Sequence, residues 1–137
     1  MKAGICGVSG RMGIAVMGVL MERGHSVAAA FDAPSAPATG KDVGTLLRGG
    51  DIGVTVAPIN EADLSRAEGI VDFSAPGATM QLLPLAVELG RPLVVGTTGL
   101  SQEQRRRIEE AARSIPLLMS PNMSVGVNLL FKLTETA

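Results

Sequence analysis

The chain has 137 residues, of which 46% are hydrophobic, but it contains three Phe and no Trp or Tyr. Its core must therefore be aliphatic, which suits buried parallel strands covered by helices. The formal net charge is −1, from 12 Lys and Arg against 13 Asp and Glu, and no long run of either sign occurs. This pattern argues against a nucleic-acid surface and against an anionic membrane patch.

Segments of strand length alternate with segments of helical pattern along the chain. The predicted strands are residues 2–8, 26–31, 52–56, 69–73, 92–95 and 115–119, and the predicted helices are 11–23, 60–67, 76–89 and 101–113, with a last helix beginning near Ser124. Residues 33–50, rich in Gly and Pro, are predicted to be a long loop with one helical turn at 42–48. The alternation predicts one α/β domain over residues 1–137, a Rossmann-like doubly wound parallel sheet with helices on both faces.

Two local features concern the predicted helices. Ser101 and Gln104 have the spacing of a capping box, in which the serine oxygen accepts the backbone N–H of Gln104 and the glutamine side chain reaches back. Pro84 lies in the middle of helix 76–89, where it lacks a backbone donor and should kink or split the helix.

The sequence indicates neither export nor membrane insertion. Cys6 is the only cysteine and is interpreted as a small buried hydrophobic residue, which agrees with a reducing compartment. The N-terminus does not resemble a signal peptide, and no apolar run approaches the roughly 20 residues that span a bilayer. We therefore expect a cytoplasmic protein with no membrane partner.

A glycine-rich turn, Gly7-Val8-Ser9-Gly10-Arg11-Met12-Gly13, joins the first strand to the first helix. Glycines allow close backbone approach, and the start of the helix offers N–H groups and the positive end of its dipole, so a cofactor diphosphate fits here. The spacing is G-x-x-G-x-x-G, and no Gly-Lys-Ser/Thr follows, which favours a dinucleotide over ATP. The alternative is that these glycines serve only tight strand–helix packing.

Asp32 ends the second strand about 20 residues beyond the glycine turn, where folds of this kind hydrogen-bond the adenosine ribose. Its alternative role is that of a simple turn former. The choice between NADH and NADPH stays open at this point. The Asp32 carboxylate favours NADH and Ala33 offers no cation, whereas Arg11 and Lys41 are cations that can accommodate a 2′-phosphate.

Three further polar segments follow predicted strands, where ligands collect in open α/β sheets: Asp72-Phe73-Ser74, Gly96-Thr97-Thr98-Gly99 and Ser120-Pro121-Asn122-Met123-Ser124. His25, the only histidine, falls at the opposite end of its strand and is not expected to be catalytic. We find no metal-ligand spacing and no Ser-His-Asp or Cys-His arrangement.

Taken in order, the glycine turn with its Gly10-Arg-Met-Gly13 core, Asp72-Phe-Ser74, Gly96-Thr-Thr-Gly99 and Asn122-Met-Ser-Val-Gly-Val-Asn128 resemble the dihydrodipicolinate reductase family over the full chain. The resemblance implies that Gly7 to Met12 hold the diphosphate of NADH or NADPH and that Asp32 holds the adenosine ribose. It also implies that Gly96 to Thr98 and Ser120 to Met123 lie on the nicotinamide side. Position 123 is often Phe in the family and is Met here, so the aromatic contact with the nicotinamide is lost.

In this family the reaction is hydride transfer from NADH or NADPH to a cyclic dicarboxylate in diaminopimelate and lysine biosynthesis. The resemblance implies a second domain after this point, with a His-His segment and a Lys that bind the substrate and supply a proton. The chain stops at Ala137, so we expect it to lack that domain and the returning final elements of the cofactor domain, and to expose an apolar patch. No catalytic residue is assigned.

We therefore expect the chain to bind the dinucleotide without catalysing reduction. The resemblance implies a full-length homotetramer built through the substrate domain, so we expect this chain to be a monomer or a weak dimer. One alternative is a stand-alone dinucleotide-binding or redox-sensing module. Another is the first half of a different two-domain dehydrogenase.

Overall fold

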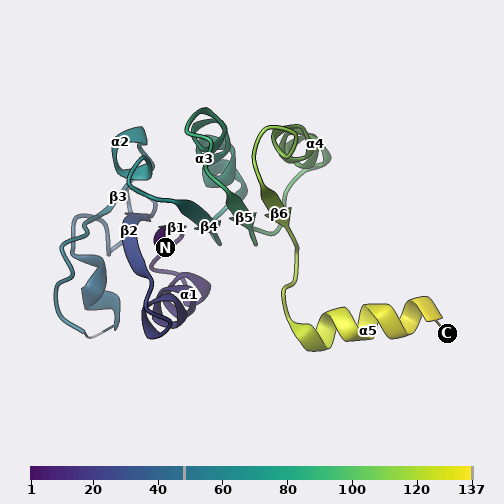
Figure 1. Ribbon diagram of the computed structural model, residues 1–137, viewed down its shortest axis with the longest axis horizontal. Coiled ribbons are helices and arrows are strands. Elements are labelled where there is room, and N and C mark those ends of the chain that lie inside the picture. The colour runs from purple at the N-terminus through teal and green to yellow at the C-terminus, as the bar shows by residue number, and fades with distance from the viewer. Residues whose placement is uncertain (48, 137) are drawn as a thin grey trace.

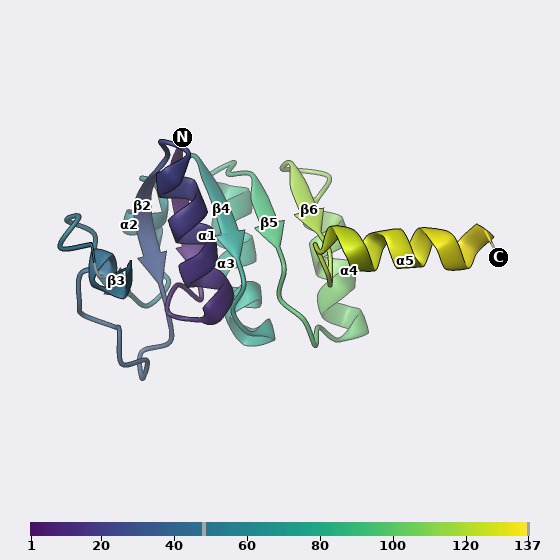
Figure 2. The same cartoon turned by 90° about the horizontal axis from the view of Figure 1, so that it is seen from below.

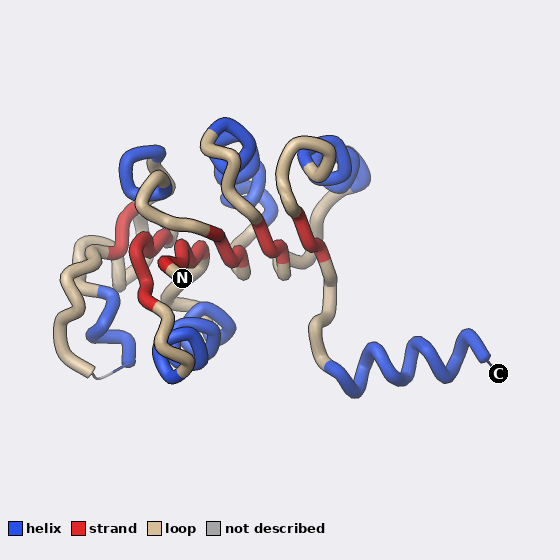
Figure 3. The backbone as a smooth tube through the Cα atoms, viewed as in Figure 1, coloured by secondary structure: helices blue, strands red, loops and turns tan. Residues whose placement is uncertain are grey.

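The computed structural model describes residues 1–47 and 49–136, with side chains through Glu135. The strands are β1 (Lys2–Cys6), β2 (Ser26–Phe31), β3 (Val56–Ala57), β4 (Gly69–Asp72), β5 (Leu93–Val95) and β6 (Leu117–Met119). All are parallel and lie in the order β3-β2-β1-β4-β5-β6, so the chain reverses direction across the sheet between β1 and β4 (Figures 1 and 3). This is the predicted doubly wound α/β sheet.

Helices cover both faces, as predicted. On one face lies α1 (Arg11–Glu22), and on the other lie α2 (Glu61–Leu64), α3 (Pro76–Glu88) and α4 (Gln102–Ala111), as Figure 1 shows. A short 3₁₀ helix, η1 (Val43–Leu47), flanks α1, and α5 (Val125–Thr136) projects from the end of β6.

Each face of the sheet has its own apolar core. The α1 face buries Ile5, Val8, Met17 and Val43, while the opposite face is built around Phe31, Ile70, Leu82 and Leu93. Cys6 belongs to the second core and is 1% exposed, so its interpretation as a buried hydrophobic residue is confirmed. Burying aliphatic surface on both sides of one sheet is what stabilises this architecture without disulfides.

The strand predicted at 52–56 is wrong over most of its length, because β3 has only Val56 and Ala57. The Asp42 carboxylate accepts hydrogen bonds from the backbone amides of Ile52, Gly53 and Val54 at 2.8–3.1 Å. Gly53 also has φ +81°, outside the range of a strand. These amides therefore turn around Asp42 and do not pair with β2.

The long loop contains the predicted helical turn as η1, whose predicted last residue, Arg48, lies outside the described residues. Pro84 does not split α3, which runs unbroken from Pro76 to Glu88, and its ring is on the exposed side of the helix. The capping box at Ser101 is confirmed, with both of its hydrogen bonds present.

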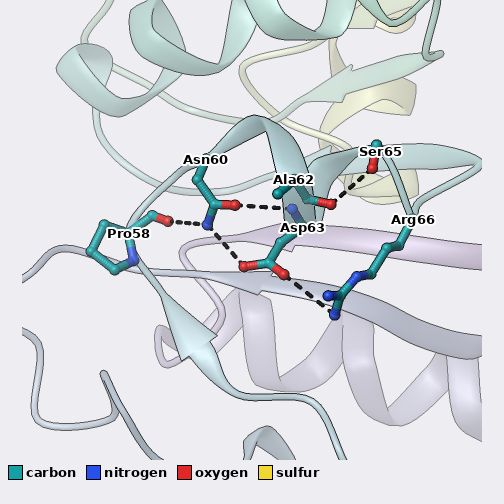
Figure 4. Close-up of polar contacts among 6 residues, drawn as sticks. All are labelled: Pro58, Asn60, Ala62, Asp63, Ser65 and Arg66. Carbon is teal, nitrogen blue, oxygen red and sulfur yellow. Dashed lines mark hydrogen bonds and ion pairs between the residues drawn. The ribbon is translucent and has the colours of Figure 1, made fainter.

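Helix α2 is shorter than the predicted 60–67 and is held by its own polar side chains (Figure 4). Asn60 caps it by accepting the Asp63 amide at 2.9 Å and donating to the Asp63 carboxylate at 2.9 Å. The Ser65 hydroxyl donates to Ala62 O, which ends the helix by satisfying a last-turn carbonyl. The Arg66–Asp63 ion pair is largely exposed and adds little stability.

Part of the sheet on the α1 side is open. Val71, Val94 and Leu118 form a row in register across β4, β5 and β6, and Leu118 is 58% exposed. In Figure 2, α1 lies in front of the middle of the sheet, and β5 and β6 have no described helix in front of them. Helix α5 also exposes apolar side chains, those of Val125, Leu129, Leu130, Phe131 and Leu133. Apolar surface of this extent is typical of a packing face.

Candidate functional site

The predicted polar segments converge on one edge of the sheet, where the parallel strands end. Neighbouring strand ends are tied by backbone hydrogen bonds: Phe73 N–H to Cys6 O at 3.1 Å, Gly96 N–H to Asp72 O at 2.8 Å and Ser120 N–H to Val95 O at 3.1 Å. The switch in strand order between β1 and β4 opens a crevice at this edge. Such crevices are where open α/β sheets bind ligands.

The first and third glycines of the turn are required by packing. Gly7 has φ +76°, and a Cβ there would lie 2.5 Å from Phe73 O. A Cβ on Gly13 would lie 2.2 Å from Gly7 O. Tight packing therefore requires glycine at these two positions, and Gly7 also lines a cavity described below. Gly10 is different, because it is exposed and its added Cβ would meet a single atom, Gly7 O, at 3.2 Å.

Most backbone amides of the turn are already hydrogen-bonded within the protein. Gly7 N–H and Val8 N–H donate to Phe31 O at 2.9 and 3.2 Å, and Gly10 N–H donates to Gly7 O at 3.1 Å. Helix α1 then begins at Arg11 with no side chain capping its first turn. The donors left to face an anion are those of the first turn of α1, reinforced by the helix dipole.

Asp32 stands beside the glycine turn and is held by three donors. One carboxylate oxygen, Oδ2, accepts Ser9 N–H at 3.0 Å and the Ser9 hydroxyl at 2.5 Å. The other, Oδ1, accepts Ala33 N–H at 2.8 Å. The carboxylate is half-buried and lies against a cavity, so it is more than a turn former.

That cavity, called here the Asp32 cavity, has a volume of about 600 Å³, within the usual size range of small-molecule sites. Its walls come from the glycine turn, the ends of β2 and β3, and the start of α3: Cys6, Gly7, Ser9, Gly10, Asp32, Ala33, Pro34, Pro58, Ile59, Phe73, Ser74, Ala75, Gly77, Ala78 and Gln81. Helix α3, like α1, has no side-chain cap at its N-terminus. Two helix starts therefore present backbone donors at this edge.

A second cavity of about 650 Å³, called here the Thr97 cavity, adjoins the first and shares Gly10, Phe73 and Ser74 with it. It is lined by Gly10, Arg11, Met12, Phe73, Ser74, Gly96, Thr97, Thr98, Pro121, Asn122, Met123 and Ser124. Together the two adjoining cavities follow a path along this edge from Asp32, past the start of α1, to the segments after β5 and β6.

Beneath this path lies a buried carboxylate, Asp72, which is 0% exposed. It accepts hydrogen bonds from Ser74 N–H at 3.0 Å, the Ser74 hydroxyl at 2.5 Å and the Thr79 hydroxyl at 2.5 Å. Thr97 Oγ1 also accepts Ser74 N–H, at 3.1 Å. Asp72 therefore fixes the loop that separates the two cavities.

Burial, followed by the nearby Asp72 charge, raises the pKa of the Cys6 thiol to about 12.

The structure brings together twelve of the fourteen predicted site residues on the cavity walls. Two lie elsewhere: Val8 is fully buried in the α1-side core, and Ser120 donates from its hydroxyl to Asn122 O at 2.8 Å. Of the two predicted cations, Arg11 lines the Thr97 cavity, whereas Lys41 lines neither. His25 lies at the opposite edge of the sheet beside the N-terminal amine, as expected.

The sequence interpretation missed the start of α3 and the segment Pro58-Ile59, which supply walls of the Asp32 cavity. Pro76 at the first helical position, after a residue with no capping side chain, was a signal that could have identified that helix start. Phe73 was noted as part of a polar segment, but its central place between the cavities was not foreseen.

The described residues show neither a metal site nor a membrane-spanning helix. Within residues 1–47 and 49–136, no group of three His, Cys, Asp or Glu side chains is arranged to hold a metal ion. Nor does that part of the chain contain a helix long and apolar enough to cross a membrane.

Comparison with known proteins is consistent along the whole chain. The sequence profile of the family described as "Dihydrodipicolinate reductase, N-terminus" matches residues 1–123. The 4-hydroxy-tetrahydrodipicolinate reductase of Aromatoleum aromaticum is 41% identical over 138 residues, which is 100% of this chain and 50% of that protein. The reductase of Ralstonia pickettii is 44% identical, over 100% of this chain and 52% of that protein.

A third relative, the 4-hydroxy-tetrahydrodipicolinate reductase of Acinetobacter baumannii, is 40% identical over 99% of this chain and 50% of its own length. The chain thus spans about half the length of the curated relatives it matches. The family profile covers every residue that lines the two cavities except Ser124. The resemblance in the sequence is confirmed: the chain belongs to the dihydrodipicolinate reductase family and corresponds to its N-terminal part.

Proposed function

We propose that the two joined cavities bind one molecule of NADH or NADPH. The adenosine half lies in the Asp32 cavity, the diphosphate lies at Gly10 and the first turn of α1, and the nicotinamide half lies in the Thr97 cavity. The observation that carries this proposal is that the two cavities adjoin and share Gly10, next to the uncapped start of α1. A dinucleotide needs two base-sized sites joined by an anion site, and this edge offers all three in order.

The residues present fit such a cofactor. Gly10 is open where a phosphate must approach the backbone, and Arg11 adds a cation on the side of the Thr97 cavity. The Asp32 carboxylate is an acceptor for ribose hydroxyls. The small residues Ala75, Gly77 and Ala78 leave room along the start of α3 for a flat adenine ring.

NADH is the preferred cofactor in this proposal. Among the described residues that line the Asp32 cavity, none is cationic, and Asp32 itself carries negative charge there. A 2′-phosphate on the ribose would face this carboxylate without a neutralising partner.

The function proposed for the whole protein is that of 4-hydroxy-tetrahydrodipicolinate reductase, the name carried by the relatives. The bound nicotinamide supplies a hydride to a cyclic dicarboxylate, in diaminopimelate and lysine biosynthesis in the cytoplasm. In this chain, Gly96 to Thr98 and Pro121 to Met123 bind and orient the nicotinamide half. A further domain brings the substrate and the proton donor. The final elements of the cofactor domain, which return after that domain, cover the open row at Val71, Val94 and Leu118.

The experiment that tests this proposal is a fluorescence titration of NADH with the 137-residue chain, competed by ADP-ribose. The chain has no Trp or Tyr, so NADH emission can be followed without energy transfer from those residues. We expect one site per chain, displaced by ADP-ribose, and no reduction of the dicarboxylate substrate by this chain alone. Failure of NADH to bind would refute the cofactor proposal, and measurable turnover would refute the requirement for a further domain. In light scattering we expect a monomer.

A further inference from the structure

Ser9 and Asp32, 23 positions apart in the sequence, are joined by two hydrogen bonds. Ser9 gives both of its donors, the backbone N–H and the hydroxyl, to the single oxygen Oδ2. Ala33 N–H donates to the other carboxylate oxygen, Oδ1. A carboxylate has roughly four acceptor positions, so three of them are filled within the protein and the open one is on Oδ1.

This arrangement fixes what the pair presents to a ligand. The hydrogen of the Ser9 hydroxyl is directed at Asp32, so the outward side of Ser9 Oγ carries only lone pairs. Oδ1 likewise offers a lone pair and negative charge. Both atoms belong to residues that line the Asp32 cavity, and together they form two neighbouring acceptors with no donor between them.

We propose that Ser9 is a positioning residue that sets the preference for NADH over NADPH. Its two hydrogen bonds fix the Asp32 carboxylate, and the same carboxylate takes the Ser9 hydroxyl hydrogen, so that Ser9 Oγ faces a ligand as an acceptor. This inference rests on the proposed function. A ribose diol has two hydroxyls to donate, and it matches two acceptors. A 2′-phosphate has no hydrogen to donate at neutral pH and meets one charged and one lone-pair-bearing oxygen.

The pairing also removes the Ser9 amide from the donors that could face the diphosphate. Its N–H is directed to Asp32, which leaves the diphosphate to the first turn of α1. Ser9 thus serves the ribose although it lies within the glycine turn. Loss of the hydroxyl should alter which nucleotide is bound, whereas a purely structural role would weaken both nucleotides equally.

The test is a double-mutant cycle on the 137-residue chain: parent, Ser9→Ala, Asp32→Ala and the double variant, each titrated calorimetrically with NADH and with NADPH. Hydrogen bonds to charged groups are strong enough that we expect Ser9→Ala to weaken NADH binding by about tenfold. NADPH should weaken less, so the ratio of the two affinities falls. In the Asp32→Ala background, Ser9→Ala should change that ratio less, because the carboxylate that Ser9 holds, and that keeps the Ser9 hydroxyl an acceptor, is gone.

Ser65→Ala is the matched control, because the Ser65 hydroxyl bonds only Ala62 O at the end of α2, away from both cavities. It should leave both affinities at the parent values. An unchanged affinity ratio in Ser9→Ala overturns the inference while the proposed function stands. So does a Ser9→Ala chain that loses its folded circular dichroism spectrum, since the residue is then structural. A parent chain that binds neither nucleotide overturns both.

Discussion

Two glycines on the same helix should respond in opposite directions to the same substitution. Gly13 and Gly18 both lie in α1, and alanine has the higher helix propensity, by about 0.5–1 kcal/mol in a helix interior. At Gly18 the added Cβ would meet only Leu47 Cδ2, at 3.9 Å, an ordinary contact. Gly18→Ala should therefore raise the free energy of unfolding by about 0.5–1 kcal/mol.

At Gly13 the same methyl group meets backbone. Its Cβ would lie 2.2 Å from Gly7 O and 2.7 Å from Val8 Cα, so either the glycine turn or α1 must move. Overpacking of this kind costs about 1–3 kcal/mol, which outweighs the gain in propensity. Since the gain in propensity is common to both, we expect Gly13→Ala to lie about 1–3 kcal/mol below Gly18→Ala in the free energy of unfolding, or roughly 4–12 °C lower in Tm.

The assay is urea unfolding followed by circular dichroism at 222 nm, with thermal melts as a second measure. Both variants must show the same dependence of the free energy on urea as the parent, so that the difference reports stability alone. If Gly13→Ala is as stable as the parent, the close approach of α1 to the glycine turn is not what fixes that turn, and the packing argument is refuted.

Three further outcomes follow from single side chains. Asp72→Ala should lower the free energy of unfolding by about 3 kcal/mol, because the Ser74 and Thr79 hydroxyls lose their short charged acceptor and Thr79 keeps only the longer bond to Ala75 O at 3.3 Å. Urea unfolding measures this, and a loss below about 1 kcal/mol would contradict it. Backbone hydrogen bonds, the one from Ile52 being the largest cause, lower the pKa of the Asp42 carboxyl below its ordinary value of 3.8. The contribution of Asp42 to stability is therefore present above pH 3.8 and is lost as the pH falls through the lowered pKa. Asp42→Asn should make the free energy of unfolding depend less on pH in this acid range, and an unaltered acid unfolding profile would contradict this. Cys6 is 1% exposed and the pKa of its thiol is raised to about 12. It should therefore react with a disulfide reagent at pH 8 only after the chain is unfolded in urea. Rapid labelling of the native chain would contradict this expectation.

The sheet and the site edge could be predicted because their signals are local. A glycine turn between a strand and a helix, together with turn-rich polar segments after each strand, requires no knowledge of distant contacts. Parallel strands bring those segments to one edge whatever their order. The serine cap of α4 was equally local, since Ser101 and Gln104 are three residues apart.

What could not be predicted depends on contacts between distant segments. Residues 52–56 alternate like a strand, but Asp42, about ten positions earlier, captures their amides. The turn amides looked available for a diphosphate until Phe31 O and Asp32 were found to accept three of them. The placement of Ser74 between the two cavities depends on the buried Asp72, whose burial the sequence pattern did not reveal.

The most direct test of the central claim, that this edge of the sheet binds a dinucleotide, is calorimetric titration of the 137-residue chain with NADH, with Asp32→Ala as the comparison. We expect binding at one site by the parent and weaker binding by the variant, because the ribose loses its acceptor. Absence of binding by the parent, or equal binding by both chains, would contradict the placement of the ribose at Asp32.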